Sequence, residues 1–564
     1  MTEGIERVRR VEEVFSYHQD TKHHPTQYAK SPGYMDWANQ PNPFREYQGA
    51  KAVLNLSLVD PHLDSTQPLL CQVLADPLEI EPKPLNKDML SQLFRDSMSL
   101  SAWKSHKQSR WALRCNPSSG NLHPTEAFVI SGPIEGLYSD PMVAHYRPKE
   151  HALEVRTTVS KEVWEQLDIG SGVLIGLSSI HWREAWKYGE RAFRYCQHDV
   201  GHAIEAIEIA AGVLGWSTKL LDDQVTYESL RCLLGLPVSD LNEKSQPIAS
   251  HEEPDCLLLL TPQNSSSPSG MSNSAFSRLI EACKYATWAG TPNVLSARQV
   301  HWPRIDDITK ATRKEAATLE SSPLNVATAQ TAAFPAMAQV PVRHVIHQRR
   351  SAQSFDPDHE PWMTADQFYS FIFSVKSQFP SLPWKPCVHL AIMVHRVHGI
   401  EPGLYILCRN QEHLTKLRSE VDKEYQWVKP TSCPAELEFH RLVVADAQKL
   451  AATISCHQEI ASDGSFALGM IAHFEDEIMN RGPWFYKRLF WETGMIGQRL
   501  YLQAEACGFR GTGIGCYFDD LFHAVLGLET FKFQSLYHFT VGYPEVDDRL
   551  ATLPPYQHLQ QRQQ

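Results

Sequence analysis

Arg349, Arg350 and Ser351 place two permanent positive charges and a hydroxyl group side by side in the sequence. Arginine binds phosphate oxygens through paired N–H groups, and the start of a helix adds further backbone N–H donors. We expect a helical segment to follow these three residues, so the stretch predicts a phosphate-binding site. The alternative interpretation is a basic pair that lies in solvent.

A second candidate site is the sequence Pro117-Ser118-Ser119-Gly120-Asn121. Its Pro, Ser, Gly and Asn content is typical of a loop. The hydroxyl, amide and backbone N–H groups of such a loop are suited to binding the polar edge of a heterocycle. A plain turn is the alternative.

Glycines alternate with other residues at positions 511, 513 and 515. Glycine has no side chain, so a backbone turn built from it can approach a flat ligand or a phosphate closely. The spacing is not the dinucleotide-binding fingerprint, because the third glycine comes one position early and a predicted helix precedes the motif. The glycines could also serve only to end that helix. Cys516 follows them, and we expect it to be a packed thiol.

The predicted helix before these glycines occurs twice in the chain. GHAIEAIEIAAGVLGW, from Gly201, aligns with GMIGQRLYLQAEACGF, from Gly494, and the spacing of 293 positions varies by one residue over roughly 55 residues. A period this long is not that of a solenoid, so it predicts two copies of one domain in a single polypeptide. The first copy has STKLL at 217–221 and lacks the alternating glycines. The duplication is therefore asymmetric.

Helices and short strands alternate in both predicted copies, which favours an α+β fold with a central mixed sheet. In the first copy we expect helices at 89–100 and 162–167 and strands at 127–131, 151–156, 173–177 and 257–260. We divide the chain into an N-terminal extension without clear periodicity (1–84), copy one (85–262), a connector (263–340), copy two (341–550) and a tail (551–564).

The composition of 42% hydrophobic and 21% charged residues is that of a soluble globular protein. A net charge of −12 argues against a nucleic-acid-binding protein. No apolar run reaches the roughly 18 residues of a membrane helix, and the charged N-terminus does not resemble a secretory signal. The twelve cysteines include no C-x-x-C pair, which indicates reduced thiols and no metal site. We therefore expect a cytoplasmic protein without a membrane or nucleic-acid partner.

Taken together, the motifs RRSAQSF, NPSSGNLHPTE, GTGIGCYFDDLFHAVLGL and VGYPEVDDR, with the paired long helices, resemble the nitroreductase-like flavoproteins. Within them the chain is most similar to the SagB-type, or thiazole/oxazole-forming, dehydrogenases, and the resemblance covers nearly the whole sequence. It implies a nitroreductase-like fold in which two domains form a dimer around long central helices, with FMN at their interface. Here the two copies would form a single-chain pseudo-dimer, and its further association is left open.

The resemblance implies one composite FMN site, with phosphate-binding residues and glycines from copy two and the 117–121 loop from copy one. The residues so implied are Arg349, Arg350, Ser351, Gln353, Arg549, Gly513, Ile514, Gly515, Pro117, Ser118, Ser119, Gly120 and Asn121. Gln353 replaces a basic residue that is usual in the family, so phosphate binding would depend more on Arg549. The reciprocal site has SLS at 99–101 instead of the arginines and PSLP at 380–383 instead of the loop. We expect it to be empty.

Lys187 and Tyr188 are similar in position to a Lys-Tyr pair that the resemblance links to removal of the substrate proton as hydride passes to the flavin. A lysine can act as a base when burial lowers its pKa; the alternative is a surface lysine beside a packed tyrosine. The implied reaction is dehydrogenation of an azoline or similar C–N substrate, either a small molecule or a peptide. Two alternatives are an NAD(P)H-dependent nitro or quinone reductase and a non-catalytic flavin-binding scaffold of a peptide-modifying complex.

Overall fold

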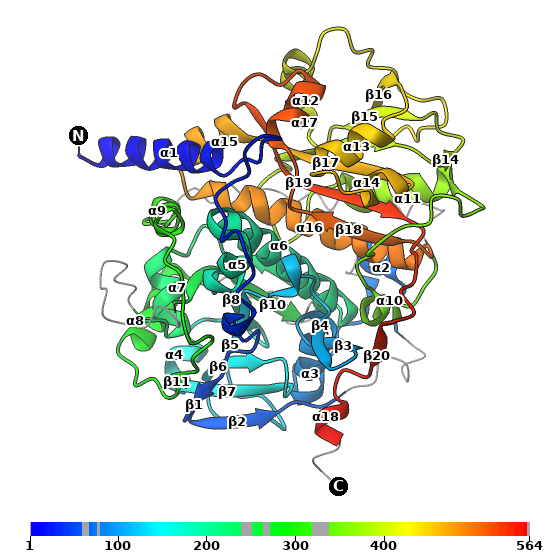
Figure 1. The fold of residues 1–564 in the computed structure, drawn as a ribbon. Helices are drawn as coiled ribbons and strands as arrows, with labels where there is room; N and C mark the ends of the chain where they lie inside the picture. Colours follow the sequence, from blue (N-terminus) through cyan, green and yellow to red (C-terminus); the bar gives the residue numbers. More distant parts are fainter. Residues whose placement is uncertain are drawn as a thin grey trace.

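Two large β-sheets form the upper and lower parts of the molecule, with long helices between them (Figure 1). The structure, a computed structural model, describes residues 2–58, 67–75, 79–237, 251–262, 271–317 and 338–560. The first sheet has the strand order β2-β7-β6-β5-β8-β10-β9, and the second has the order β16-β15-β13-β17-β19-β18. Neighbouring strands in both sheets run antiparallel. A central mixed sheet was expected. Among the described strands, the parallel pairing lies in a separate two-stranded sheet, β12–β14.

The strands of the first sheet are β2 (Ala52–Asn55), β5 (Thr125–Ser131), β6 (Met142–Arg147), β7 (Ala152–Thr158), β8 (Val173–Ser179), β9 (Trp216–Leu220) and β10 (Glu253–Pro262). Those of the second are β13 (Val388–Val394), β15 (Gly403–Leu407), β16 (Phe439–Val444), β17 (Phe466–His473), β18 (Arg510–Ile514) and β19 (Phe533–Gly542). Smaller sheets contain β1 (Tyr47–Gln48), β3 (Leu100–His106), β4 (Ser109–Arg114), β11 (Thr291–Pro292), β12 (Met363–Thr364), β14 (Val397–His398) and β20 (Ala551–Leu553). The expected α+β class is confirmed.

The same succession of elements follows β8 in the first sheet and β17 in the second. After β8 come α5 (His181–Tyr188), α6 (Ala192–Val213), β9, α7 (Tyr227–Leu234) and β10; after β17 come α15 (Phe474–Arg481), α16 (Phe485–Ala506), β18, α17 (Asp519–Leu526) and β19. Helices α6 and α16 each have 22 residues, and α5 and α15 each have 8. The repeated sequence therefore lies in matching elements.

Helices α6 and α16 cross at the two glycines that begin the repeated sequence. A Cβ atom added to Gly201 would overlap the backbone oxygen of Trp491, and one added to Gly494 would overlap that of His198. Only a residue without a side chain lets the two backbones come this close. Both helices are buried along almost their whole length.

Buried ion pairs join the two halves beside this crossing. Arg499 pairs with Glu205 at 2.6 Å, and Asp519 pairs with both Arg191 and Arg194 at 3.0 Å. All five side chains are almost completely excluded from solvent. Because an unmatched buried charge is costly, such pairs favour one arrangement of the halves over others.

Both ends of the chain pack across the two halves. The N-terminal extension, expected to lack periodicity, begins with helix α1 (Thr2–Asp20), which packs on α9 (Pro303–Ala311). Its buried His18 lies 3.2 Å from Tyr486 of α16. At the other end, β20 pairs with β3 in a three-stranded sheet, so the chain returns from the second sheet to the lower part of the molecule (Figure 1).

The remaining helices are α2 (Leu70–Ala75), α3 (Lys87–Ser97), α4 (Lys161–Glu165), α8 (Asn273–Lys284), α10 (Val342–Gln348), α11 (Ala365–Lys376), α12 (Gln411–Glu420), α13 (Gln448–Ile454), α14 (Ile460–Asp463) and α18 (Gln557–Gln560). Residues 263–270 and 318–337 of the predicted connector lie outside the described residues. No helix in the described ranges is long and apolar enough to span a membrane.

Two sequence expectations about local structure were wrong. The helix near Arg349 and Arg350 is α10, which ends at Gln348, so these arginines follow a helix and do not precede one. Of the alternating glycines, Gly511 and Gly513 lie in strand β18, which pairs with β19, and not in a turn; Gly515 directly follows the strand.

Candidate functional site

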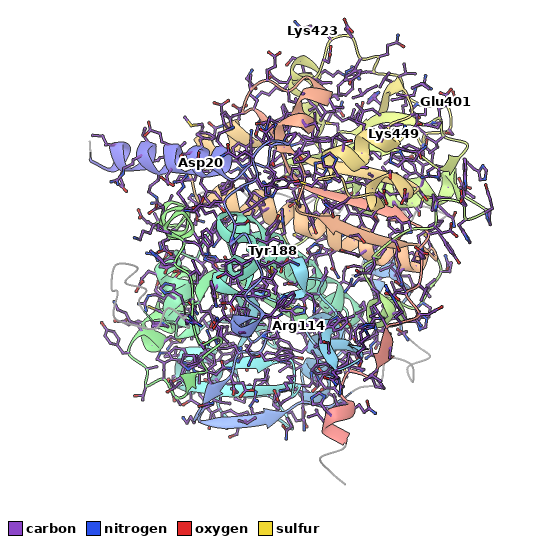
Figure 2. All side chains as sticks on the ribbon, in the orientation of Figure 1. Asp20, Arg114, Tyr188, Glu401, Lys423 and Lys449 are labelled. Atoms are coloured by element: carbon purple, nitrogen blue, oxygen red, sulfur yellow. The ribbon has the colours of Figure 1, made fainter. Side chains whose placement is uncertain are left out.

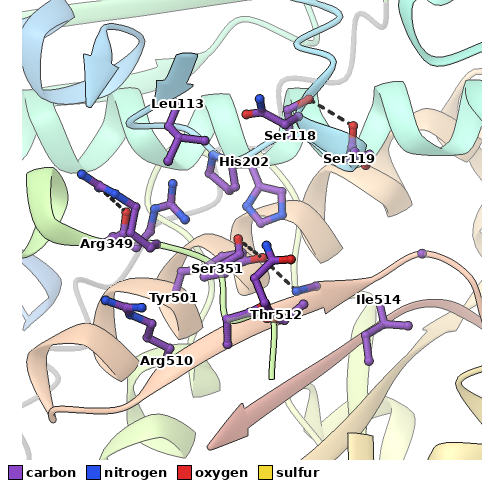
Figure 3. A pocket seen from close by; sticks show the side chains of 18 of the residues that line it. Leu113, Ser118, Ser119, His202, Arg349, Ser351, Tyr501, Arg510, Thr512 and Ile514 are labelled. Carbon is purple, nitrogen blue, oxygen red and sulfur yellow. Dashed lines mark hydrogen bonds between the residues drawn. The ribbon is translucent and has the colours of Figure 1, made fainter. Parts of the chain in front are cut away.

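A cavity of about 750 Å³ lies where strand β18 faces the 117–121 loop (Figure 3). One side is formed by β3, β4 and that loop, and the other by residues 349–353, β18 and the segment 545–552. Helices α5, α6 and α16 contribute side chains between them. Arg114 and Tyr188, which both line it, lie near the centre of the molecule (Figure 2).

Six cationic side chains line the cavity, Arg114 and Lys187 among them. The other four lie close enough to influence one another's charge: Lys104, Arg349, Arg350 and Arg510. Arg349 is buried and donates a hydrogen bond to the backbone oxygen of Arg114 at 3.2 Å, whereas its Nε atom is buried without a partner. In the described part of the chain neither Arg349 nor Arg350 forms an ion pair, and Arg510 lies 3.9 Å from one carboxylate. This part of the cavity therefore has an excess of positive charge.

The cations also disfavour one another's charged forms. Burial, followed by the charge of Arg349, lowers the pKa of Arg350 to about 10. Burial, followed by the charges of Arg350 and Arg510, lowers the pKa of Lys104. A bound anion would reverse this effect because it stabilises the charged form of each group. A phosphate group matches both the charge and the donor geometry.

Ser351 and the glycine strand meet at one tyrosine. The hydroxyl of Ser351 and the backbone N–H of Gly513 both donate to the Tyr501 hydroxyl, at 3.0 and 2.9 Å. A Cβ atom on Gly513 would overlap the hydroxyl of Tyr537, and one on Gly515 the ring of Tyr195. Glycine is therefore required at these two positions because aromatic side chains of the chain itself fill the space of a Cβ atom. The expected reason was a different one, the close approach of a ligand.

The 117–121 loop is held in place by a carboxylate on α6. Asp199 accepts hydrogen bonds from the backbone N–H and the hydroxyl of Ser119, both at 3.0 Å. Asn121 donates to the backbone oxygen of Ala112 at 2.9 Å. Burial raises the pKa of Asp199 to about 7. No sequence pattern singles out Asp199, because it lies in a helix some 80 residues away from the loop.

Lys187 and Tyr188 lie directly against this loop. A Cβ atom on Gly120 would come within 2.6 Å of the Tyr188 hydroxyl and 3.2 Å of the Lys187 Nζ atom. Both side chains are half-buried and line the cavity. Glu184, one turn earlier, has two buried carboxylate oxygens without hydrogen-bond partners, and burial, followed by the charge of Asp199, raises its pKa.

His202 of α6 lines the cavity, above Ser351 and Tyr501 in the view of Figure 3. Its Nε2 atom is 3.2 Å from the Tyr537 hydroxyl, and its Nδ1 atom is buried without a partner. Burial, followed by the charge of Arg349, lowers the pKa of His202 to about 3. The imidazole is therefore neutral at physiological pH and offers one nitrogen to a ligand.

The structure brings the predicted site residues together, with one exception. Those that line the cavity are Pro117, Ser118, Ser119, Gly120, Asn121, Lys187, Tyr188, Arg349, Arg350, Ser351, Gln353, Gly513, Ile514 and Gly515. Arg549 does not line it: its side chain is 79% exposed and pairs with Asp547 at 2.8 Å. Arg510 supplies the further arginine, and its position next to Gly511 was a signal that could have identified it.

At the position that the repeat spacing relates to the cavity, residues of the chain contact one another. The hydroxyl of Ser381 donates to Glu208, and the backbone N–H of Leu220 donates to the Ser381 oxygen at 2.9 Å. Glu208 corresponds to Tyr501 at the repeat spacing of 293 positions, so a carboxylic acid replaces the tyrosine that lines the cavity. Burial, followed by the charge of Glu205, raises the pKa of Glu208 to about 8.

Residues 80–246 match the family model described as Nitroreductase family. Among solved structures, a crystal structure from Anabaena variabilis, described as a candidate nitroreductase, shares 20% identity with a TM-score of 0.65. The match covers 94% of this chain and 99% of that chain. The chain therefore has a nitroreductase-like α+β fold over almost its full length.

Other solved structures match a shorter part. A candidate nitroreductase from Ralstonia eutropha and NfrA1 of B. megaterium each share 13% identity over 37% of this chain. The matches cover 85% and 68% of those chains, with TM-scores of 0.26 and 0.23. No curated protein sequence matches this chain.

Proposed function

We propose that this protein is an FMN-dependent oxidoreductase with one flavin site built from both halves of the chain. The observation that carries the proposal is the group of cations Lys104, Arg349, Arg350 and Arg510 at a cavity of about 750 Å³. Among the described residues neither Arg349 nor Arg350 forms an ion pair, and Arg510 has one long pair, with Glu505 at 3.9 Å. That volume is in the usual range for a cofactor site. The match of residues 80–246 to the Nitroreductase family supports a flavin as the ligand.

The residues present fit FMN. The four cations and Ser351 would hold the phosphate, while the 117–121 loop and strand β18 would flank the ring. When bound, the flavin supplies two-electron redox chemistry. The chain supplies binding, orientation and a site partly closed to water.

We further infer that the chain is a tandem duplication whose two copies pair as a pseudo-dimer. The constant spacing of the repeat, the equal lengths of α6 and α16 and the contact of Gly201 with Gly494 support this arrangement. At the reciprocal position, the contacts of Ser381 with Glu208 and Leu220 take up the space next to the helix. One flavin per chain follows.

The favoured reaction is dehydrogenation of an azoline or similar C–N substrate, either a small molecule or part of a peptide. Such a substrate loses a hydride to the flavin and a proton to a base. Lys187 and Tyr188 are the residues that we propose for the proton, because both line the cavity beside Gly120. Asp199 positions the same loop through Ser119.

A second candidate is an NAD(P)H-dependent nitro or quinone reductase, which the match to the Nitroreductase family favours. Anaerobic mixing with NADPH separates the two functions. Rapid bleaching of the flavin, followed by reoxidation with a quinone or nitroaromatic compound, would select the reductase. Bleaching by an azoline-containing peptide, but not by NADPH, would select the dehydrogenase.

Flavin content tests the proposal itself. The purified protein is expected to be yellow, to show the spectrum of oxidised flavin and to release one FMN per chain on denaturation. A colourless protein that does not bind added FMN would overturn the proposal. Release of two FMN per chain would support FMN as the cofactor but would refute the proposal that the reciprocal site is closed.

A further inference from the structure

Two cysteines from separate segments meet beside the cavity. Cys516 follows Gly515 at the end of β18 and lines the cavity, and Cys456 lies in the loop between α13 and α14. Their Sγ atoms are 2.9 Å apart, and both side chains are half-buried. No other two cysteines in the described ranges have sulfur atoms in such contact. The expectation that Cys516 is only a packed thiol does not account for this pair.

The chain holds the two segments together on both sides of the pair. Gln458 donates to the backbone oxygen of Cys516 at 3.1 Å, and the backbone N–H of Phe518 donates to the Ile454 oxygen at 2.7 Å. Cys456 itself has a φ of 54°, in the left-handed region that non-glycine residues seldom adopt. Such a conformation persists where surrounding contacts impose it, and it is often found at functional sites.

The surroundings make the two thiols unequal. The hydrogen bond with Cys456, followed by contacts with His23 and the charge of Arg191, lowers the pKa of Cys516 to about 5. The same hydrogen bond, followed by burial, raises the pKa of Cys456. The two sulfur atoms thus share one hydrogen bond, and the lowered pKa of Cys516 favours its thiolate form. A thiolate in contact with a second thiol is the usual arrangement of a redox-active dithiol.

We propose that Cys456 and Cys516 form a redox-active dithiol–disulfide pair that exchanges two electrons with the flavin. On oxidation one S–S bond forms, the Cys456 thiol releases its proton, and two electrons pass to the oxidised flavin. On reduction the bond breaks, and the two sulfurs take up two electrons and a proton. A disulfide bond is about 2.05 Å long, so the sulfur atoms have to approach by only ~0.9 Å. That the flavin is the electron partner rests on the proposed function, whereas the dithiol pair itself does not depend on it.

The pair is tested without any flavin by equilibration in glutathione buffers of different redox potential. The protein is then alkylated with N-ethylmaleimide and digested, and the peptides are analysed by mass spectrometry. We expect a disulfide-linked peptide between 456 and 516 in the oxidising buffers. It should be absent in Cys456→Ser and Cys516→Ser and retained in Cys507→Ser, a half-buried cysteine without a cysteine neighbour. No linked peptide in the most oxidising buffer would overturn the pair.

Electron exchange with the flavin is tested by anaerobic titration of the FMN-loaded protein with dithionite after mild oxidation. The wild-type chain and Cys507→Ser should take up about four electrons, two for the flavin and two for the disulfide. Cys456→Ser should take up about two. A linked peptide together with only two electrons in the wild type would refute the exchange. A protein that binds no FMN would refute the proposed function, whereas the peptide experiment would still decide the pair.

Discussion

At the scale of single residues, Arg349 has the most unusual environment in the cavity. Its charge is buried, its Nε atom has no partner, and burial lowers its pKa. A phosphate would supply the missing acceptor. We expect Arg349→Ala to weaken FMN binding about 10- to 100-fold, because a hydrogen bond to a charged group contributes about 1.5–3 kcal/mol. Fluorescence titration of the flavin-free protein measures this change.

Riboflavin, which lacks the phosphate, is the matched control ligand for this prediction. Its affinity should be nearly the same in the wild type and in Arg349→Ala. The exposed Arg418→Ala should change neither affinity. If riboflavin and FMN lose affinity equally in Arg349→Ala, the arginine does not act on the phosphate.

Lys187 is expected to act in turnover and not in cofactor binding. Lys187→Met should retain one FMN per chain and lower the rate of flavin reduction by the substrate about 10²-fold or more, as for loss of an acid–base group. Rapid-reaction spectroscopy measures that rate. An unchanged rate would remove Lys187 from the mechanism, and loss of the flavin would make it a binding residue.

Asp199 makes the stability of the fold dependent on pH. Its folded-state pKa of about 7 lies above the ordinary value of 3.8. Between these values the folded state holds a proton that the unfolded state has lost, so stability falls as pH rises from about 4 to 7 and then levels off. The loss is on the order of 4 kcal/mol. Asp199→Asn keeps a similar shape without titrating.

Urea unfolding of the wild type and Asp199→Asn across this pH range measures the effect. The difference in the free energy of unfolding between the two proteins should shift in favour of the variant as pH rises toward 7. A difference that stays constant with pH would show that Asp199 is ionised in the fold.

The site residues that the sequence could predict lie in short contiguous motifs. Positions 117–121 and 349–351 were identified because neighbouring residues share one property, either turn formation or charge. Lys104 and Asp199 come from a strand and a helix, and only the fold brings them to the cavity. The family resemblance implied Arg549 as a late arginine of the phosphate site, but this residue pairs with Asp547, two residues earlier, and is exposed.

At the scale of elements, the crossing of α6 and α16 determines how the halves meet. We expect Gly494→Ala to lower the free energy of unfolding by about 1–3 kcal/mol or more, because the added methyl would overlap the backbone at His198. Chemical denaturation monitored by tryptophan fluorescence measures this loss. Gly4→Ala, at an exposed position of α1 with no atom near the added methyl, should be neutral or stabilise by up to about 1 kcal/mol. Equal effects of both variants would contradict a tight crossing.

The elements also show what sequence patterns can and cannot specify. The paired glycines predicted the repeat because two matching helices keep the same close contact. Alternating glycines at 511, 513 and 515 indicated a turn, yet Gly511 and Gly513 lie in strand β18. Phe539, Tyr537 and Tyr195 fill the space of the missing side chains. Those rings are distant in sequence from the glycines, so the local pattern does not contain this information.

At the scale of the whole molecule, the C-terminal segment closes the cavity from outside. It leaves the second sheet, contributes Leu550 and Thr552 to the cavity, and pairs with β3 beside Lys104. Thr552 accepts a hydrogen bond from Lys104 at 2.7 Å. The sequence 551–553 has no apolar periodicity, and its first two residues are exposed. The crossing of this segment was therefore not visible in the sequence, although the repeated helix was.

A chain that ends at Arg549 tests this role of the segment. Truncation removes β20 and the buried Tyr556, whose hydroxyl donates to the Pro148 oxygen at 2.8 Å and accepts from the Leu100 N–H at 3.1 Å. We expect a lower thermal midpoint and at least about tenfold weaker FMN binding, because Lys104 loses its hydrogen-bond partner and the cavity loses one wall. Calorimetry and flavin titration measure the two effects.

A chain that ends at Gln560 keeps β20 and Tyr556 and is the matched control for this truncation; it should behave as the full chain. Tyr556→Phe separates the two contributions, since it removes the hydroxyl but leaves the strand. It should lower the thermal midpoint with a smaller loss of FMN affinity than the truncation. If the chain ending at Arg549 binds FMN as tightly as the full chain, the segment stabilises the fold without forming part of the binding site.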